Sequence, residues 1–251
     1  MTPAWAALTD TGQVRPENQD RALALELPGG AVLLLVADGV GGSPGGALAS
    51  EETARVVREV FEEFAGSAPY AGLLLTAVNL ANERVRLLQE QKPEFGNMAT
   101  TLVVAVIEGA TASVANAGDS RGYLFHMGKL AQVTEDDSWV AGEVRAGRLS
   151  PEEAGTHPWR NVITRGIGVE DTAEPTVTPV ALEPGDALLL CTDGLFKMLP
   201  DDDITRILMG AGDAGHAARA LVDSANARGG VDNIGVALWM GEPLSSQVTL
   251  R

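Results

Sequence analysis

Residues 31–37, AVLLLVA, form a strand-length run without one polar side chain. Successive side chains of a β-strand point to opposite faces of its sheet, so both faces of this strand must be covered. Residues 187–192, ALLLCT, show nearly the same pattern in the second half of the chain. The two runs predict central strands that are buried between layers of other structure.

Amphipathic segments supply the layers that such strands need. Apolar residues recur every three or four positions in residues 49–64 and 73–88, and helical patterns return at 201–209 and 214–227. Further strand patterns lie at residues 5–8, 21–27, 101–107, 112–117, 122–126 and 233–240. This order of elements predicts an α+β fold, a four-layer α-β-β-α sandwich of two mostly antiparallel sheets flanked by helix pairs.

A long polar insert interrupts this pattern at residues 134–165, with two short helical pieces near 139–146 and 151–154. An insert of this length without a strand of its own is usually functional, although a passive surface loop would look the same. We expect one domain over residues 1–241 that contains this insert, followed by a C-terminal tail at 242–251.

Charge and cysteine content exclude several kinds of protein. The 18 Lys and Arg residues against 34 Asp and Glu residues give a net charge of −16, which repels nucleic acid and anionic membranes. The one cysteine, Cys191, excludes an internal disulfide and a cysteine-based zinc cluster, and we expect a packed thiol there. Neither a targeting sequence nor a membrane-length apolar run is found, so we expect a cytoplasmic monomer with no nucleic-acid or membrane partner.

Five aspartates stand at the ends of predicted strands: Asp20, Asp38, Asp119, Asp193 and Asp232. Aspartate is an ordinary turn residue, which explains any one of them alone. Several carboxylates at one rim would repel one another, however, and their pKa values would rise unless a cation lay between them. Oxygen ligands without cysteine or histidine favour Mg²⁺ or Mn²⁺ over Zn²⁺. The pattern therefore indicates a candidate site for hard cations.

Arg15, in the polar segment at residues 9–20, is a candidate anion-binding group. A guanidinium beside divalent ions can hold phosphate through paired hydrogen bonds. An ordinary surface arginine is the other explanation, and the residue alone leaves both open.

Short motifs occur in order along nearly the whole chain: TDTGQVRPENQD at 9–20, VADGVGG at 36–42, MATT at 98–101, AGDSR at 117–121, HPWR at 157–160, CTDGL at 191–195 and GVDN at 230–233. Together they resemble the metal-dependent Ser/Thr protein phosphatases, the protein phosphatase 2C family, in their short bacterial form. The resemblance implies the same four-layer sandwich, with a metal centre at one end of the two sheets. It identifies residues 134–165 as a flap beside the active site, anchored by His157 and Trp159.

The resemblance also implies a role for each candidate residue. The implied ligands of two Mn²⁺ or Mg²⁺ ions are Asp38, which bridges the ions, the Gly39 carbonyl, Asp193, Asp232, and Asp20, which holds metal-bound water. Asp119, together with Asp193, is the implied ligand of a third, weaker ion. Arg15 is the implied phosphate-binding residue, and Asn233 supports Asp232 unless it is an ordinary turn residue. Arg15, Asp38 and Asp193 are thus the expected catalytic residues.

The implied reaction is hydrolysis of phosphoserine and phosphothreonine in proteins, by direct attack of a metal-bridging water, in opposition to a bacterial Ser/Thr kinase. Two alternatives stay open. A pseudophosphatase would keep the fold and bind or regulate partners with little turnover. A phosphatase of anti-sigma-factor antagonists would keep the chemistry and act on one dedicated class of partner.

Two positions depart from the family pattern. Ser43 stands where many members carry a histidine that is assigned as the general acid, and Asp136-Asp137 stands where many bacterial members have Asp-His. Serine is a poor acid at neutral pH, although it can orient a metal-bound water. The departure favours either weak turnover or protonation of the leaving group by metal-bound water.

We predict that Ser43→His raises the rate on a phosphoserine peptide more than the rate on an aryl phosphate, because aryl leaving groups need little protonation. The measurement is kcat/KM for both substrates, with wild type and variant side by side. An unchanged or lower ratio of the two rates would contradict the prediction.

Overall fold

A computed structural model describes residues 4–40, 44–64, 69–95 and 98–242. The strands are β1 (Trp5–Asp10), β2 (Asp20–Glu26), β3 (Val32–Val40), β4 (Ala99–Thr100), β5 (Leu102–Glu108), β6 (Thr111–Ala117), β7 (Arg121–His126), β8 (Lys129–Gln132), β9 (Thr176–Ala181), β10 (Ala187–Cys191) and β11 (Ile234–Met240). The helices are α1 (Pro44–Phe64), α2 (Tyr70–Gln91), α3 (Trp139–Arg145), α4 (Pro151–Thr156), α5 (Asp193–Phe196), α6 (Asp201–Gly210) and α7 (Ala214–Ala227), with a 3-10 turn at Pro93–Phe95.

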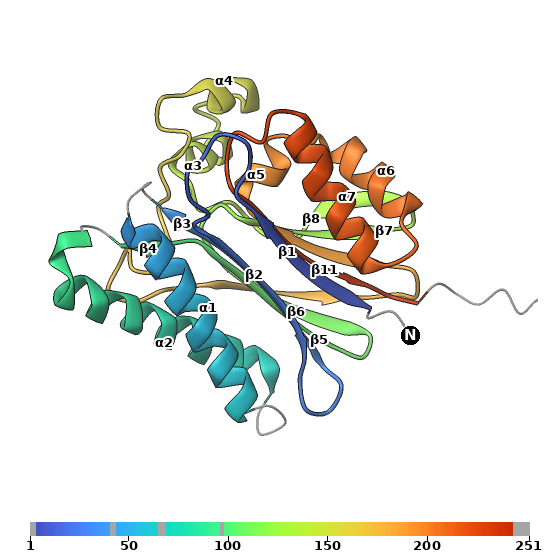
Figure 1. Ribbon diagram of the computed structural model, residues 1–251, viewed down its shortest axis with the longest axis horizontal. Coiled ribbons are helices and arrows are strands. Elements are labelled where there is room, and N and C mark those ends of the chain that lie inside the picture. Colours follow the sequence, from blue (N-terminus) through green and yellow to red (C-terminus); the bar gives the residue numbers. More distant parts are fainter. Residues whose placement is uncertain (1–3, 41–43, 65–68, 96–97, 243–251) are drawn as a thin grey trace, which may run out of the picture.

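The strands form two sheets that pack face to face (Figure 1). One sheet runs in the order β1-β11-β10-β7-β8, and the other in the order β2-β3-β5-β6-β9 with β4 beside β3. Every pairing among the described strands is antiparallel. The predicted pair of mostly antiparallel sheets is confirmed.

The two apolar runs are central strands with both faces covered. In β3 the odd-numbered residues 33–37 pack with α1 and α2, whereas the even-numbered residues 32–36 pack against the other sheet. In β10, Leu189 packs with α6 and α7, and Leu190 faces the sheet that contains β3. The strand period of two thus divides each apolar run between two separate cores.

Helix pairs form the outer layers of the sandwich (Figure 1). Phe61 of α1 and Leu74 of α2 are fully buried on the sheet that contains β3. Leu208 of α6 and Leu221 of α7 are buried in the same way on the other sheet. The predicted α-β-β-α order is therefore confirmed. Among the described residues, no helix is long and apolar enough to cross a membrane.

The elements that were not predicted from the sequence include β4, α5 and the two strands β8 and β9. Both strands lie at sheet edges, and their exposed, mixed side chains carry no clear period. Pro179 lies within β9, which is tolerated because an edge strand leaves one side of its backbone unpaired. β3 also continues to Val40, past the expected loop start at Asp38, because β4 pairs with its last residues.

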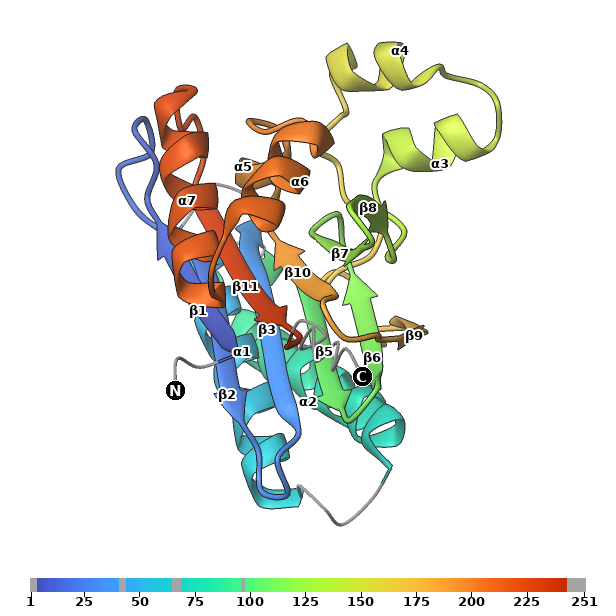
Figure 2. The same cartoon turned by 90° about the vertical axis from the view of Figure 1, so that its right-hand side faces the viewer.

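The insert between β8 and β9 carries α3 and α4, as expected, and projects beyond the end of the sheets (Figure 2). Ser138 caps α3 by accepting a hydrogen bond from Ala141 N. Ser150 and Glu153 form a capping box at the start of α4. Such caps satisfy backbone N–H groups that a short helix otherwise exposes to solvent.

We predict that Leu190→Ala lowers the free energy of unfolding by about 2–5 kcal/mol, because it leaves a cavity between the two sheets. Leu80→Ala is the matched control, since Leu80 lies on α2 with 40% of its surface exposed. Urea unfolding followed by circular dichroism measures both. A loss below about 1 kcal/mol at position 190 would show that the sheets do not pack through this residue.

Candidate metal centre

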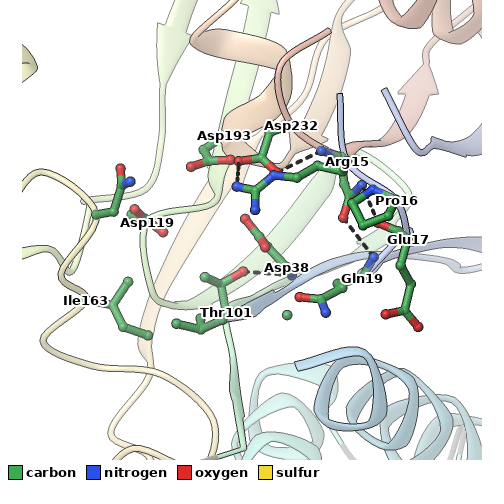
Figure 3. Close-up of a pocket in the computed structure, with 14 residues that line it drawn as sticks. Arg15, Pro16, Glu17, Gln19, Asp38, Thr101, Asp119, Ile163, Asp193 and Asp232 are labelled. Carbon is green, nitrogen blue, oxygen red and sulfur yellow. Dashed lines mark hydrogen bonds and ion pairs between the residues drawn. The ribbon is translucent and has the colours of Figure 1, made fainter. Parts of the chain in front are cut away.

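Four of the five predicted aspartates, all but Asp20, line a cavity of about 400 Å³ at one end of the two sheets (Figure 3). Its lining includes Asp38, Asp119, Asp193, Asp232 and Arg15. These residues come from β3, from the β6–β7 loop, from the start of α5, and from the segments before β11 and β2. The sandwich therefore brings together side chains that are more than 200 positions apart in the sequence.

Asp20 and Asp38 face each other across the pairing of β2 with β3. Asp20 is 1% exposed, and its Oδ2 accepts a hydrogen bond of 2.7 Å from Thr192 Oγ1. Burial raises the pKa of Asp20 to about 8, and the charges of Asp193 and Asp232 add to that effect. Burial, together with the charge of Asp20, also holds the pKa of Asp38 well above its ordinary value. A carboxylate pair of this kind is stabilised by a cation.

Asp193 begins α5 directly after β10, and Gly194 presses against the segment before β11. A Cβ at position 194 would lie 1.9 Å from the carbonyl oxygen of Asn233. That close approach of two backbones sets Asp193 beside Asp232 at the rim of the cavity (Figure 3).

Asn233 ties the polar segment at residues 9–20 to the start of β11. Its side-chain nitrogen donates to Thr11 O at 2.8 Å and Glu17 O at 2.9 Å, and its side-chain oxygen accepts from Gln19 N at 2.8 Å. Its backbone N–H donates to Asp232 Oδ1 at 2.9 Å. Asn233 therefore positions both Asp232 and the segment that carries Arg15.

Gly39 lies in β3 and lines the cavity next to Asp38. A Cβ at this position would lie 2.5 Å from the carbonyl group of Gly46 in α1. Glycine thus lets the end of β3 pass directly against the start of α1. Ser43, the position that departs from the family pattern, lies outside the described residues.

Two cations offset part of the negative charge. Arg15 Nη2 donates to Asp232 Oδ2 at 2.7 Å, and this hydrogen bond raises the pKa of Arg15. Lys197 Nζ donates to Asp193 Oδ2 at 2.5 Å. By contrast, three of the five carboxylates form no ion pair with any described residue: Asp20, Asp38 and Asp119.

The carboxylates fit divalent cations. Asp20 Oδ1 and Asp193 Oδ1 are buried and have no hydrogen-bond partner within the described ranges. Buried polar atoms are rarely left unpaired, so these oxygens are suited to a ligand. No three acidic, histidine or cysteine side chains of the described residues are grouped closely enough to hold one ion by themselves. Mg²⁺ in proteins commonly keeps several waters and only one or two carboxylates, which suits this wider arrangement.

Asp119 lies in the loop between β6 and β7, at the side of the cavity nearest the insert (Figure 3). Burial raises its pKa to about 6, the charge of Asp193 adds to the rise, and Lys197 opposes it. Nearby, Thr101 Oγ1 accepts a hydrogen bond from Asp38 N at 3.0 Å and lies 2.7 Å from Ser120 Oγ. Thr101 therefore links the backbone of β3 to the loop that carries Asp119.

Asp136 and Asp137, the other departure from the family pattern, hold the base of the insert. Asp136 accepts paired hydrogen bonds from Arg121, the shortest at 2.7 Å. Asp137 is 2% exposed, forms an ion pair with Arg165, and bonds through its backbone N–H to Gly118 O at 2.9 Å. The two aspartates fasten the insert beside Asp119.

The aromatic side chains of the insert pack on one another. Trp139 stacks on His157 with ring centroids 4.8 Å apart, and Trp159 meets Trp139 edge-on at 4.7 Å. Trp139 begins α3 and His157 follows α4, so this cluster joins the two helices. His157 and Trp159 thus hold the insert together internally, whereas Asp137 attaches it to the sheets.

Several residues of the site were not singled out from the sequence: Thr101, Asn161, Thr192 and Lys197. Thr101 and Thr192 lie inside motifs that were recognised, but their hydrogen bonds depend on neighbouring strands. Lys197 could have been predicted from the sequence, because a cation four residues after Asp193 can reach that aspartate across one turn of helix.

A sandwich of this kind, with carboxylates and an arginine around a cavity at the end of its sheets, defines a metal-dependent hydrolase. The model of the family described as Protein phosphatase 2C matches residues 13–222, and the chain belongs to that family.

Relatives of known name and structure agree with this assignment. The serine/threonine phosphatase stp of Listeria monocytogenes is 35% identical over 233 residues, which are 92% of this chain and 92% of that protein. The structure of Stp1 from Staphylococcus aureus is similar with a TM-score of 0.90 at 30% identity, covering 96% of each chain. The catalytic domain of the phosphatase PstP, in complex with two manganese ions, gives a TM-score of 0.83 at 33% identity, covering 95% of this chain and 98% of that one.

We predict that Gly194→Ala weakens Mn²⁺ binding, because the new Cβ would push Asp193 away from the segment that carries Asp232. Gly210→Ala is the control: a Cβ there meets nothing within 4 Å, so stability stays equal or rises slightly. The measurement is the rise in melting temperature with added Mn²⁺, which reports binding to the folded state. An equal rise in wild type and Gly194→Ala would show that this contact does not shape the site.

Proposed function

We propose that this chain is a Mn²⁺- or Mg²⁺-dependent phosphatase that removes phosphate from phosphoserine and phosphothreonine in proteins. The observation that carries the proposal is the set of carboxylates around one cavity, with buried oxygens that lack partners and an arginine at the rim. The names of the relatives support the substrate class, and the two manganese ions in PstP support the metal.

We further propose the following assignment of the site residues. Asp38 would be shared by two ions, the Gly39 carbonyl, Asp193 and Asp232 would complete their protein ligands, Asp20 would hold coordinated water, and Asn233 would support Asp232. The partnerless Oδ1 atoms of Asp20 and Asp193 support their part in this assignment. Thr192 keeps Asp20 oriented by donating to its other oxygen.

When bound, divalent ions at such a centre lower the pKa of coordinated water and neutralise negative charge on the phosphoryl group. The reaction also needs a group that binds the phosphate oxygens, and Arg15 is placed to do this through its guanidinium. Its side chain is 45% exposed and reaches the cavity from the rim, where it pairs with Asp232. Incoming phosphate can take over hydrogen bonds of this guanidinium, because an arginine offers five N–H donors.

The surroundings of the site suggest how a protein substrate is presented. The cavity is also lined by Asn161 and Ile163 of the insert, so a bound phosphopeptide would contact that segment. We propose that residues 134–165 act as the substrate-facing flap of one catalytic domain over residues 1–241. A phosphatase of this kind opposes a Ser/Thr kinase, and we propose that it works as a cytoplasmic monomer.

We predict that phosphate release from a phosphothreonine peptide requires Mn²⁺ or Mg²⁺ and stops when a chelator is added. Asp38→Asn lowers kcat/KM by at least about 100-fold, since the variant loses charge at the proposed bridging position. Arg15→Ala lowers it by about 10- to 100-fold, which corresponds to one charged hydrogen-bonding group.

Arg58→Ala is the control for Arg15, because Arg58 has a similar side-chain exposure of 48% and lies on α1, away from the cavity. The control keeps wild-type activity. A folded protein that binds Mn²⁺ but releases no phosphate with either metal would overturn the proposal and favour a pseudophosphatase.

A further inference from the structure

Lys197 places a cation beside the carboxylates on the side of the cavity that faces the insert. It follows α5, four residues after Asp193, and its Nζ lies 2.5 Å from Asp193 Oδ2 and 3.0 Å from Asn161 Oδ1. One ammonium group thus joins a proposed metal ligand to a residue of the flap.

The ammonium lies beside one of the two aspartates that are expected to hold a third ion. The family resemblance implies that Asp119 and Asp193 together hold this ion. Asp119 and Lys197 both line a second cavity, of about 860 Å³, under the flap. The positive charge of Lys197 acts on both aspartates and counteracts the rise in the pKa of Asp119.

The two oxygens of Asp193 are used differently. Oδ1 is buried and has no hydrogen-bond partner among the described residues, so it is available to the ions bridged by Asp38. Oδ2 is the oxygen that accepts from Lys197. A third ion that shared Asp193 with those two would need Oδ2, where the ammonium already is.

The ammonium is a stable occupant. It is held by two acceptors at once, Asp193 Oδ2 and Asn161 Oδ1. A tethered ammonium also occupies its position at any metal concentration, whereas a weakly held ion leaves when its free concentration falls.

We infer that the Lys197 ammonium takes the place of a third divalent ion, so that the chain binds two ions and joins Asn161 of the flap to the centre through a side chain. The inference rests on the metal centre of the proposed function. It replaces the expected role of Asp119 as an ion ligand: in this chain Asp119 lies beside a fixed lysine charge.

The test is a count of bound Mn²⁺ per chain by equilibrium dialysis, carried to millimolar free metal. Wild type binds two ions. Lys197→Met, which keeps the length of the side chain but removes its charge, binds a third ion, and Lys197→Gln repeats the test if the methionine variant does not fold. Adding Asp119→Asn to either variant removes the third ion again.

Lys129→Met is the matched control, because Lys129 is an exposed lysine in β8 and does not line either cavity. This control binds two ions. Three ions in the wild type would overturn the inference, and so would two ions in folded Lys197 variants at the highest metal concentration.

The count separates this inference from the proposed function. A chain that binds two ions and hydrolyses no phosphopeptide would overturn the proposed function and leave the inference standing. A wild-type chain that hydrolyses phosphopeptides with three ions bound would overturn the inference and leave the proposed function standing.

Discussion

Mutual repulsion of carboxylates at one end of the sandwich is the constraint on which the rest of the site depends. Their interaction strengthens as water is excluded, and burial raises the pKa of Asp20 to about 8. Arg15 and Lys197 each pair with one of the five aspartates, which leaves most of the negative charge uncompensated. A cluster of this kind persists in a folded protein because divalent cations stabilise it when they bind.

Strand pairing and backbone contacts fix the positions of the aspartates relative to one another. Asp20 and Asp38 are opposite each other in the β2–β3 ladder, and the contact of Gly194 with Asn233 brings Asp193 to Asp232. Groups held by strand pairing and backbone contact move little, which suits a site that must place several oxygens around small ions. The insert at residues 134–165 is attached at its base by hydrogen bonds of Asp137 to Gly118 and of Asp136 to Arg121. The sheets therefore carry the proposed chemistry, and the insert is the part proposed to face the substrate.

The sequence predicted the layers of the fold and five of the aspartates at the site. Apolar runs and helical periods are strong signals because they reflect burial along a single segment. The edge strands β8 and β9 gave weak signals, since exposed strands need no regular apolar pattern. The spacing of Lys197 from Asp193 was a usable signal that was overlooked, whereas its contact with Asn161 of the insert depends on the fold.

By itself, the sequence determined which segments are buried, that carboxylates stand at strand ends, and to which family the motifs point. The tertiary structure decided which oxygens remain without partners and which are already taken by a cation. The physical reason is that burial patterns are local and repeat along the chain, whereas the pairing of charges depends on distances between segments far apart in sequence. For this protein that distinction matters most at Asp193, where one oxygen is available to a metal ion and the other accepts a hydrogen bond from a lysine.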